Sequence, residues 1–306
     1  MEASAAGHAT TLTPALRPLL EELGELKRVR SAGREGSIAT RLFQAGWARL
    51  VAGETTEAAM RATVADALAA ARLGDLDAAA LGAAGMTAAE ILAVRRRAVE
   101  EVSAEFPPEL RALLQAGLEA APAPQVALPR FVGQLAEQPR AGVTCPGKPR
   151  LLLEPPENHA EHCLIVAVYG VVLAPRYGAD PATVFLASMA HHLHNALLPD
   201  SGFTGEVLLG DRLEPVFARA TEIALEELPG PLRDAVVVAR RILPDAESGD
   251  SKTFHAADTL DRVLQIAQHL RAGQTTMHYV LHDMALVHEG AVKDFQDVVL
   301  RETGLL

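Results

Sequence analysis

Histidines cluster in the second half of the chain at spacings that suit metal ligation. They occur in three short stretches, "NHAEHC" at 158–163, "HHLHN" at 191–195 and "FHAAD" at 254–258. Side chains three or four residues apart share one face of a helix, and each stretch offers such a pair. Imidazole combined with carboxylate is a donor set that suits Mn, Fe, Co, Ni or Zn. The sequence therefore predicts a divalent metal ion held by side chains from three helices.

The surroundings of these residues favour a buried site over a set of surface polar groups. The first two stretches adjoin the apolar runs "CLIVAVYG" and "VFLASMA", which are typical of helices that face a protein core. A buried imidazole or carboxylate without a partner is costly, so such groups should be paired or bound to metal. A histidine pair on its own is a common surface feature, and only the combination of the three stretches favours a metal site.

The order of the three motifs resembles the HD-domain superfamily, over roughly residues 155–275. Members of that family hold metal with a histidine, an adjacent His-Asp dyad and a distal aspartate on successive helices. The stretch "AEHCLIVAVYGVVLA" is similar to the first of these helices, and the resemblance implies that His162 is the first ligand. The stretch "HAADTLDRV" is similar to the last motif and implies Asp258 as the distal ligand.

The adjacent His-Asp dyad of the family is absent from the second of these helices. Two registers replace it. The pair His191-His192 puts an imidazole where the carboxylate should be, and the pair His194-Asn195 puts a neutral amide there. Both registers remove one negative charge from the predicted site, which should weaken metal binding and change the metal that fits.

The resemblance implies a metal-dependent hydrolase that acts on a small phosphorylated metabolite or nucleotide, with metal that binds phosphate and activates a water. Asp200 and Glu206 follow the histidine cluster in a turn and are the candidate catalytic acids or bases. One alternative is an HD-type non-haem iron oxygenase with a rearranged ligand set, since no histidine lies between Asn195 and His255, where di-iron members carry two. Another is a non-catalytic HD-derived binding or regulatory module.

Several further polar residues receive structural interpretations. Asp261 lies one turn after Asp258 and is expected to cap or pair on the helix surface. The literal pair His282-Asp283 follows the distal aspartate motif, in the wrong order for a dyad, and is interpreted as a coincidence. The compact basic run at 27–34 is interpreted as a solvated helix end, and Trp47 as a core residue.

Composition narrows the class of protein. The chain has 306 residues and a formal net charge of −11, which argues against nucleic acid or an anionic membrane as a partner. Its two cysteines do not make a disulfide framework. The first residues lack a signal-peptide pattern, and no apolar run reaches the ~20 residues of a membrane span. We expect a cytoplasmic protein with reduced thiols and a small-molecule substrate.

Alanine and leucine dominate the apolar residues, which favours helix over strand. We predict an all-α protein with an N-terminal helical domain at 1–125, a linker or surface strap rich in Pro and Gly at 126–157, and an HD-like helical metal-binding domain at 158–306. The N-terminal domain is expected to cover the metal domain, to shape its pocket or to form a homodimer.

Overall fold

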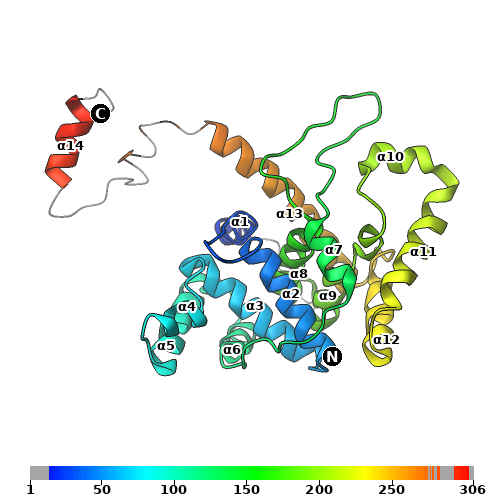
Figure 1. Cartoon of the computed structure of the whole chain (residues 1–306), viewed down its shortest axis with the longest axis horizontal. Helices are drawn as coiled ribbons and strands as arrows, with labels where there is room; N and C mark the ends of the chain where they lie inside the picture. The colour runs from blue at the N-terminus through cyan, green and yellow to red at the C-terminus, as the bar shows by residue number, and fades with distance from the viewer. Residues whose placement is uncertain (1–13, 275, 277, 279–280, 283–292, 303–306) are drawn as a thin grey trace, which may run out of the picture. The chain divides into compact units, whose positions relative to one another are not determined.

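The protein is all-α, as predicted, in the computed structural model (Figure 1). The structure describes residues 14–274, 276, 278, 281–282 and 293–302. Over these residues the only β-type pairings are two isolated bridges, between Pro139 and Asn158 and between Val143 and Leu151. None of the helices in the described part of the chain is long and apolar enough to cross a membrane.

The first half forms one short 3-10 helix and seven α-helices. These are η1 (Pro14–Leu16), α1 (Arg17–Glu25), α2 (Ile38–Val51), α3 (Thr56–Leu73), α4 (Ala78–Ala83), α5 (Ala88–Val102), α6 (Pro108–Gly117) and α7 (Arg130–Glu137). Several begin at side-chain caps that are visible in the sequence. Thr87, for example, caps α5 in a capping box closed by Glu90.

The second half continues with helices of very different length. These are α8 (His159–Tyr177), α9 (Pro181–Met189), η2 (Leu193–Ala196), α10 (Gly202–Leu209), η3 (Gly210–Arg212), α11 (Leu213–Leu225), α12 (Gly230–Ala239), η4 (Arg240–Ile242), α13 (Gly249–Gln274) and α14 (Lys293–Glu302).

The chain divides into two compact units, residues 1–262 and residues 263–306. The first unit includes helices from both sides of the predicted linker at 126–157, and α2 and α3 pack against α8 and α9 within it. This division differs from the predicted one because apolar faces of the N-terminal helices are buried against the central helices. The second unit contains the end of α13 and the helix α14, in which Lys293 pairs with Asp297.

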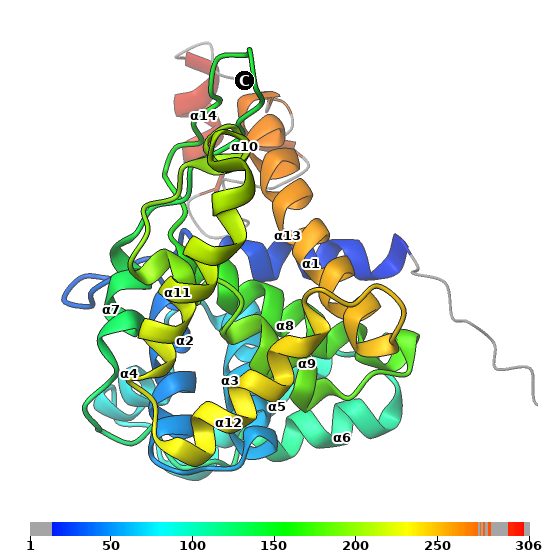
Figure 2. The ribbon, with the colours of Figure 1, turned by 90° about the vertical axis from the view of Figure 1, so that its right-hand side faces the viewer.

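Helix α8 lies at the centre of the first unit, with α9 beside it (Figures 1 and 2). Every residue from His159 to Ala174 is buried, so this helix has no solvent-facing side over that length. Gly170 allows the close approach of α9, because a Cβ atom at this position would lie 2.5 Å from the Val184 side chain. A helix that is apolar all round belongs in a core, and its few polar residues are therefore held inside the protein.

The segment 126–157 is more ordered than a simple linker. It contains α7, whose Phe131, Val132 and Leu135 are fully buried. Phe131 packs edge to face on Trp47 at a centroid distance of 4.9 Å, and Trp47 is completely buried, as predicted. The apolar residues of α7 recur at helical spacing, which is the pattern that indicates this helix. The high Pro and Gly content of the whole segment had favoured a linker instead.

Candidate metal centre

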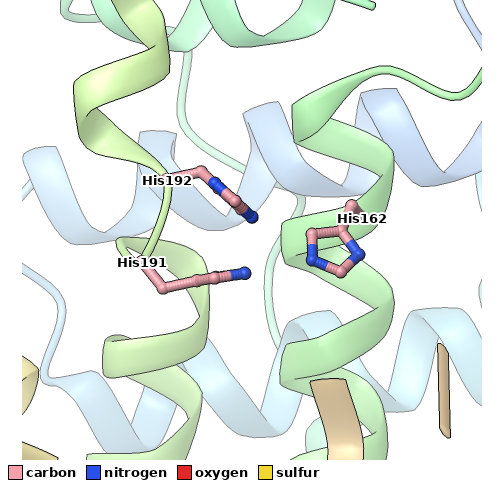
Figure 3. A group of neighbouring side chains, drawn as sticks. All are labelled: His162, His191 and His192. Atoms are coloured by element: carbon pink, nitrogen blue, oxygen red, sulfur yellow. The ribbon is translucent and has the colours of Figure 1, made fainter. Parts of the chain in front are cut away.

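Three imidazoles from two neighbouring segments converge on one point (Figure 3). His162 comes from the first turns of α8, and His191 and His192 follow the end of α9. One ring nitrogen of each lies within 4.8 Å of those of the other two, a spacing at which the group can hold a metal ion. His162 is fully buried, whereas His191 and His192 are only partly buried, so one side of the group is open to solvent.

Each of the three imidazoles uses its Nδ1 atom for a hydrogen bond to an oxygen. His162 Nδ1 lies 2.7 Å from Asp261 Oδ2, and His191 Nδ1 lies 2.6 Å from the carbonyl oxygen of Ser188. His192 Nδ1 lies 2.8 Å from Asn195 Oδ1. These oxygens accept, so each Nδ1 carries a proton, and in the neutral form of the ring each Nε2 presents a lone pair. Metal-ligating histidines are held by bonds of this kind.

The end of α9 allows two adjacent histidines to serve one site. Neighbouring residues of a continuous α-helix point about 100° apart, because a turn takes 3.6 residues. Helix α9 ends at Met189, and the chain changes direction before η2. The rings of His191 and His192 then lie with centroids 4.2 Å apart. The bond from His191 to the Ser188 carbonyl also satisfies a backbone acceptor that the end of the helix leaves open.

Asp258 completes the group with a carboxylate. Its Oδ1 atom lies 3.2 Å from His162 Nε2, and its side chain is 19% exposed. The two atoms are not in hydrogen-bond geometry, and His162 Nε2 is a buried nitrogen without a hydrogen-bond partner. A lone pair that faces a carboxylate oxygen is unfavourable unless a positive charge lies between them. A metal ion coordinated by both atoms satisfies this arrangement.

The electrostatics of the cluster keep His191 and His192 neutral and the Asp258 carboxylate charged. Burial, reinforced by the charges of neighbouring groups, lowers the pKa of His191 to about 3 and that of His192 well below its ordinary value. Burial raises the pKa of Asp258, but the neighbouring His162, His191 and Arg262 outweigh this effect, and the net pKa is lowered. Metal ligands must be deprotonated to bind, and His191, His192 and Asp258 meet that condition at neutral pH.

A network of buried charges lies on the opposite side of the His162 ring. Lys27 Nζ lies 2.7 Å from Asp261 Oδ1 and 2.7 Å from Glu157 Oε1. Arg140 approaches Glu157 from another side, with 3.7 Å between its Nη1 and Glu157 Oε2. Asp261 thus accepts bonds from Lys27 and from His162 at the same time, which fixes the orientation of the His162 ring.

This network corrects two predictions. Asp261 is 1% exposed and bonded to His162, so the prediction that it caps or pairs on the helix surface is wrong. Lys27 is 5% exposed, so the prediction of a solvated helix end is wrong at this residue. Asp258 and Asp261 are three residues apart on α13 and share one of its faces, and this spacing was the available signal for Asp261. No pattern around Lys27 or Glu157 could have paired two residues 130 positions apart.

The structure separates the two registers that the sequence left open. The His194 ring stacks on Phe217 at a centroid distance of 4.1 Å and lies 5.5 Å from the ring of His192, but His194 is not part of the converging group. Asn195 accepts the bond from His192 Nδ1 and donates to the carbonyl oxygen of Leu198. The pair His191-His192 therefore lies in the cluster with His162, and Asn195 supports it through its bond to His192.

Asp200 and Glu206, the predicted catalytic residues, lie near the edge of the cluster. Asp200 accepts backbone bonds from Ala141 and Gly202, and its Oδ2 atom lies 3.7 Å from His159 Nε2. Glu206 is on α10, where partial burial and the negative charge of Asp200 raise its pKa. Backbone bonds hold the Asp200 carboxylate in place, and neither carboxylate is in the group of ligand atoms that come together around His162, His191 and His192.

Three further histidines have distinct environments. His159 is fully buried, its ring centroid is 4.7 Å from that of His192, and neither of its ring nitrogens has a hydrogen-bond partner. His255 is exposed and bonded to the carbonyl oxygen of Asp245, so it does not share the environment of Asp258. His282 is exposed, and Asp283, its partner in the literal His-Asp pair, lies outside the described residues.

Both cysteines are free thiols, in agreement with the prediction that they form no disulfide framework, and buried Cys163 contacts His191 Nδ1 at 3.6 Å.

Comparison of the chain with protein-family models, with curated proteins and with solved structures gave no match. The predicted HD-like ancestry, the cytoplasmic location and the partners therefore stay predictions.

Proposed function

We propose that this protein is a metal-dependent hydrolase with an HD-like site that acts on a small phosphorylated metabolite or nucleotide. The observation that carries the proposal is the set of three imidazoles, each with a bonded Nδ1 atom and one ring nitrogen within 4.8 Å of those of the others, next to the Asp258 carboxylate. We infer that His162, His191, His192 and Asp258 hold one divalent ion. Manganese, iron, cobalt, nickel and zinc all accept this donor set.

The charge of this donor set favours an anionic substrate. Three neutral imidazoles and one carboxylate leave a divalent ion with a net positive charge, which a family-type His-Asp dyad would have reduced further. When bound, the ion would supply Lewis acidity toward a phosphoryl oxygen and lower the pKa of a water. The missing dyad carboxylate thus makes the site weaker for metal and more attractive for phosphate.

Arg140 is the candidate anchor for the substrate phosphate. Its positive charge lowers the pKa of His159, His191 and His192. Its Nη1 atom is buried and has no hydrogen-bond partner, although Glu157 is 3.7 Å away. A guanidinium with a free N–H group suits a phosphate oxygen in both charge and geometry.

Glu206 and Asp200 are the candidate proton carriers at this edge of the site. A raised pKa suits a carboxyl group that must donate a proton near neutral pH, and the pKa of Glu206 is raised. Arg262, which pairs with Asp258 at 3.1 Å, also acts electrostatically on Glu206. We therefore assign Glu206 to leaving-group protonation and Asp200 to holding His159 and the loop at 141 in place.

The first experiment measures metal content and phosphatase activity together. Protein purified without added metal or chelator is expected to hold about one ion per chain, and Asp258→Ala is expected to lose it. The same pair of proteins is then assayed against phosphomonoesters and nucleotides with Mn²⁺, Co²⁺ or Ni²⁺. Asp234→Ala is the matched control, because Asp234 is exposed on α12. Metal retained in Asp258→Ala, or phosphate release that this change leaves intact, would contradict the proposal.

An iron oxygenase is the second candidate, and His159 is the observation that favours it. Its two unpartnered, buried ring nitrogens lie beside His192 and give the site a fourth imidazole close to the cluster. Iron sites of oxygenases use several histidines with one carboxylate. Two irons per chain and dioxygen uptake, with no phosphate release, would favour this candidate over the hydrolase. A protein with no bound metal and no activity in either assay would favour the third candidate, a non-catalytic binding or regulatory module.

A further inference from the structure

Lys27 sits in a place that a metal ion could otherwise take. Glu157, His162 and Asp261 form a second group whose ligand atoms all lie within 4.8 Å of one another, and all three residues are buried. Lys27 Nζ is 2.7 Å from Glu157 Oε1 and 2.7 Å from Asp261 Oδ1. The second group therefore already contains a positive charge that belongs to the chain.

We propose that Lys27 takes the place of a second cation at His162, so that the site holds one exchangeable metal ion and one covalently attached positive charge. The geometry gives this ammonium a specific task. It binds both carboxylates of the second group, and Asp261 in turn accepts the Nδ1 proton of His162. Lys27 is thus a positioning residue for the His162 ring.

The charge balance of the second group supports this assignment. Two buried carboxylates without a cation would be strongly destabilising, because each charge would be left without compensation. Burial lowers the pKa of Lys27, but the charges of Asp261 and Glu157 outweigh it and raise the net pKa, so the side chain stays protonated. The ammonium group is covalently attached and cannot leave the site, whereas a second metal ion would exchange with ions in the solvent.

The inference also gives the N-terminal half a role at the site. Lys27 lies just after the end of α1, and α1 packs against α8. Ser37, at the start of α2, donates a 2.6 Å bond to the buried Glu161 of α8. One connection from the N-terminal half therefore reaches the first turn of α8, where His162 lies, and the other reaches Glu157, two residues before α8, and Asp261 on α13. The first half of the chain completes the metal site through the charge of Lys27.

The test is the number of Co²⁺ ions bound per chain, measured by elemental analysis after gel filtration and by titration of the visible Co²⁺ spectrum. Lys27→Ala removes the ammonium and leaves space between the carboxylates, so it is expected to bind one more Co²⁺ than the wild-type chain. Lys27→Arg keeps the positive charge and is expected to match the wild type. Lys252→Ala, at an exposed position of α13, is the matched control.

The first Co²⁺ ion in this test rests on the proposed function. The experiment therefore has to distinguish a failure of the proposed metal site from a failure of the proposed role of Lys27. One Co²⁺ ion in both the wild type and Lys27→Ala would overturn the role of Lys27 and leave the proposed metal site standing, whereas no ion in either would overturn both. No ion in the wild type with one in Lys27→Ala would overturn the proposed metal site and support the role of Lys27.

Folding of the variant provides a second readout. Without metal, Lys27→Ala is expected to unfold at lower denaturant concentration than the wild type, and added Co²⁺ should restore it. The double variant Lys27→Ala with Glu157→Gln should regain no stability from Co²⁺ beyond the wild-type response, because one ligand of the second group is gone. A Lys27→Ala chain that stays unfolded at saturating Co²⁺ would overturn the proposal, since no cation then replaces the ammonium.

Discussion

The two sides of the His162 ring balance charge in different ways. On the Nδ1 side, Asp261, Glu157 and Lys27 form a closed network of short bonds between opposite charges. On the Nε2 side, His191, His192 and Asp258 surround a buried nitrogen that has no hydrogen-bond partner. Buried polar groups in native proteins are nearly always satisfied. The closed side is therefore structural, and the open side is where the proposed metal ion would complete the site.

The largest expected effect that separates the two sides is the response to acid. The pKa of His191 is lowered to about 3 and that of His159 to about 2, in both cases mainly by burial. Below pH 6.5 the unfolded chain takes up protons that the folded chain refuses, so stability falls as the pH drops toward these values. Each such group contributes about 1.4 kcal/mol per pH unit. The closed side behaves differently. Because the pKa of Asp261 is lowered, the stability that this carboxylate contributes is lost only below about pH 4.

Urea unfolding of metal-free protein between pH 7.5 and 4.5 measures this dependence. We expect a loss of stability that becomes steep below about pH 6.5, and a slope smaller by about one proton in His159→Gln. His255→Gln, at an exposed position, is the matched control and should keep the wild-type slope. Stability that stays flat from pH 6.5 to 5 would contradict the neutral, buried state of these imidazoles.

The next effect tests which histidines form the open side. His192→Ala removes a converging imidazole and is expected to weaken metal binding by more than about 100-fold, since the loss of outer contacts alone costs 10- to 100-fold. His194→Ala is expected to change affinity little, because that ring stacks on Phe217. Metal-competition titration with a chromophoric chelator gives both affinities. A reversed order would assign the dyad position to His194 and Asn195.

A smaller effect is expected on the closed side. Asp261→Asn keeps the shape of the side chain but removes the charge that Lys27 and His162 share. Metal affinity should fall by about 10- to 100-fold, as is usual when a partner of a ligating histidine is lost. The same titration measures it, with Asp250→Asn near the start of α13 as the control. Unchanged affinity would mean that the two sides of the ring are not coupled.

The fold class was predictable from the sequence, because helix caps and apolar spacing are local signals. The buried helix at 159–177 and the core position of Trp47 follow from such patterns. The sequence also brought His162, His191, His192 and Asp258 into one candidate set with His194 and Asn195, through helical spacing, apolar surroundings and the resemblance to the HD-domain superfamily. What it could not give was the register, which depends on the break after Met189 that turns both adjacent rings toward His162.

The closed side was not predictable for a different reason. Lys27 and Asp261 are separated by 234 positions in the chain and meet only because α1 and α13 are both brought to α8. A lysine in a basic run and an aspartate on a polar helix face resemble ordinary surface residues. Their burial is a property of the packed helices, and composition or spacing carries no record of it.

The smallest expected effect comes from Asn195→Asp, which restores a literal His-Asp pair at 194–195. If this pair were the family-type dyad, the new carboxylate would bind the metal directly and raise affinity by orders of magnitude. In the structure, Asn195 Oδ1 instead accepts the Nδ1 proton of His192. A carboxylate there makes His192 a more basic ligand, so we expect metal affinity to rise by less than about tenfold. Stability should fall, because the hydrogen bond that the buried Asn195 side-chain amide donates to the Leu198 carbonyl oxygen is lost. The chelator titration distinguishes the two results, and Asn195→Ala, which removes the acceptor, is expected to change affinity in the opposite direction.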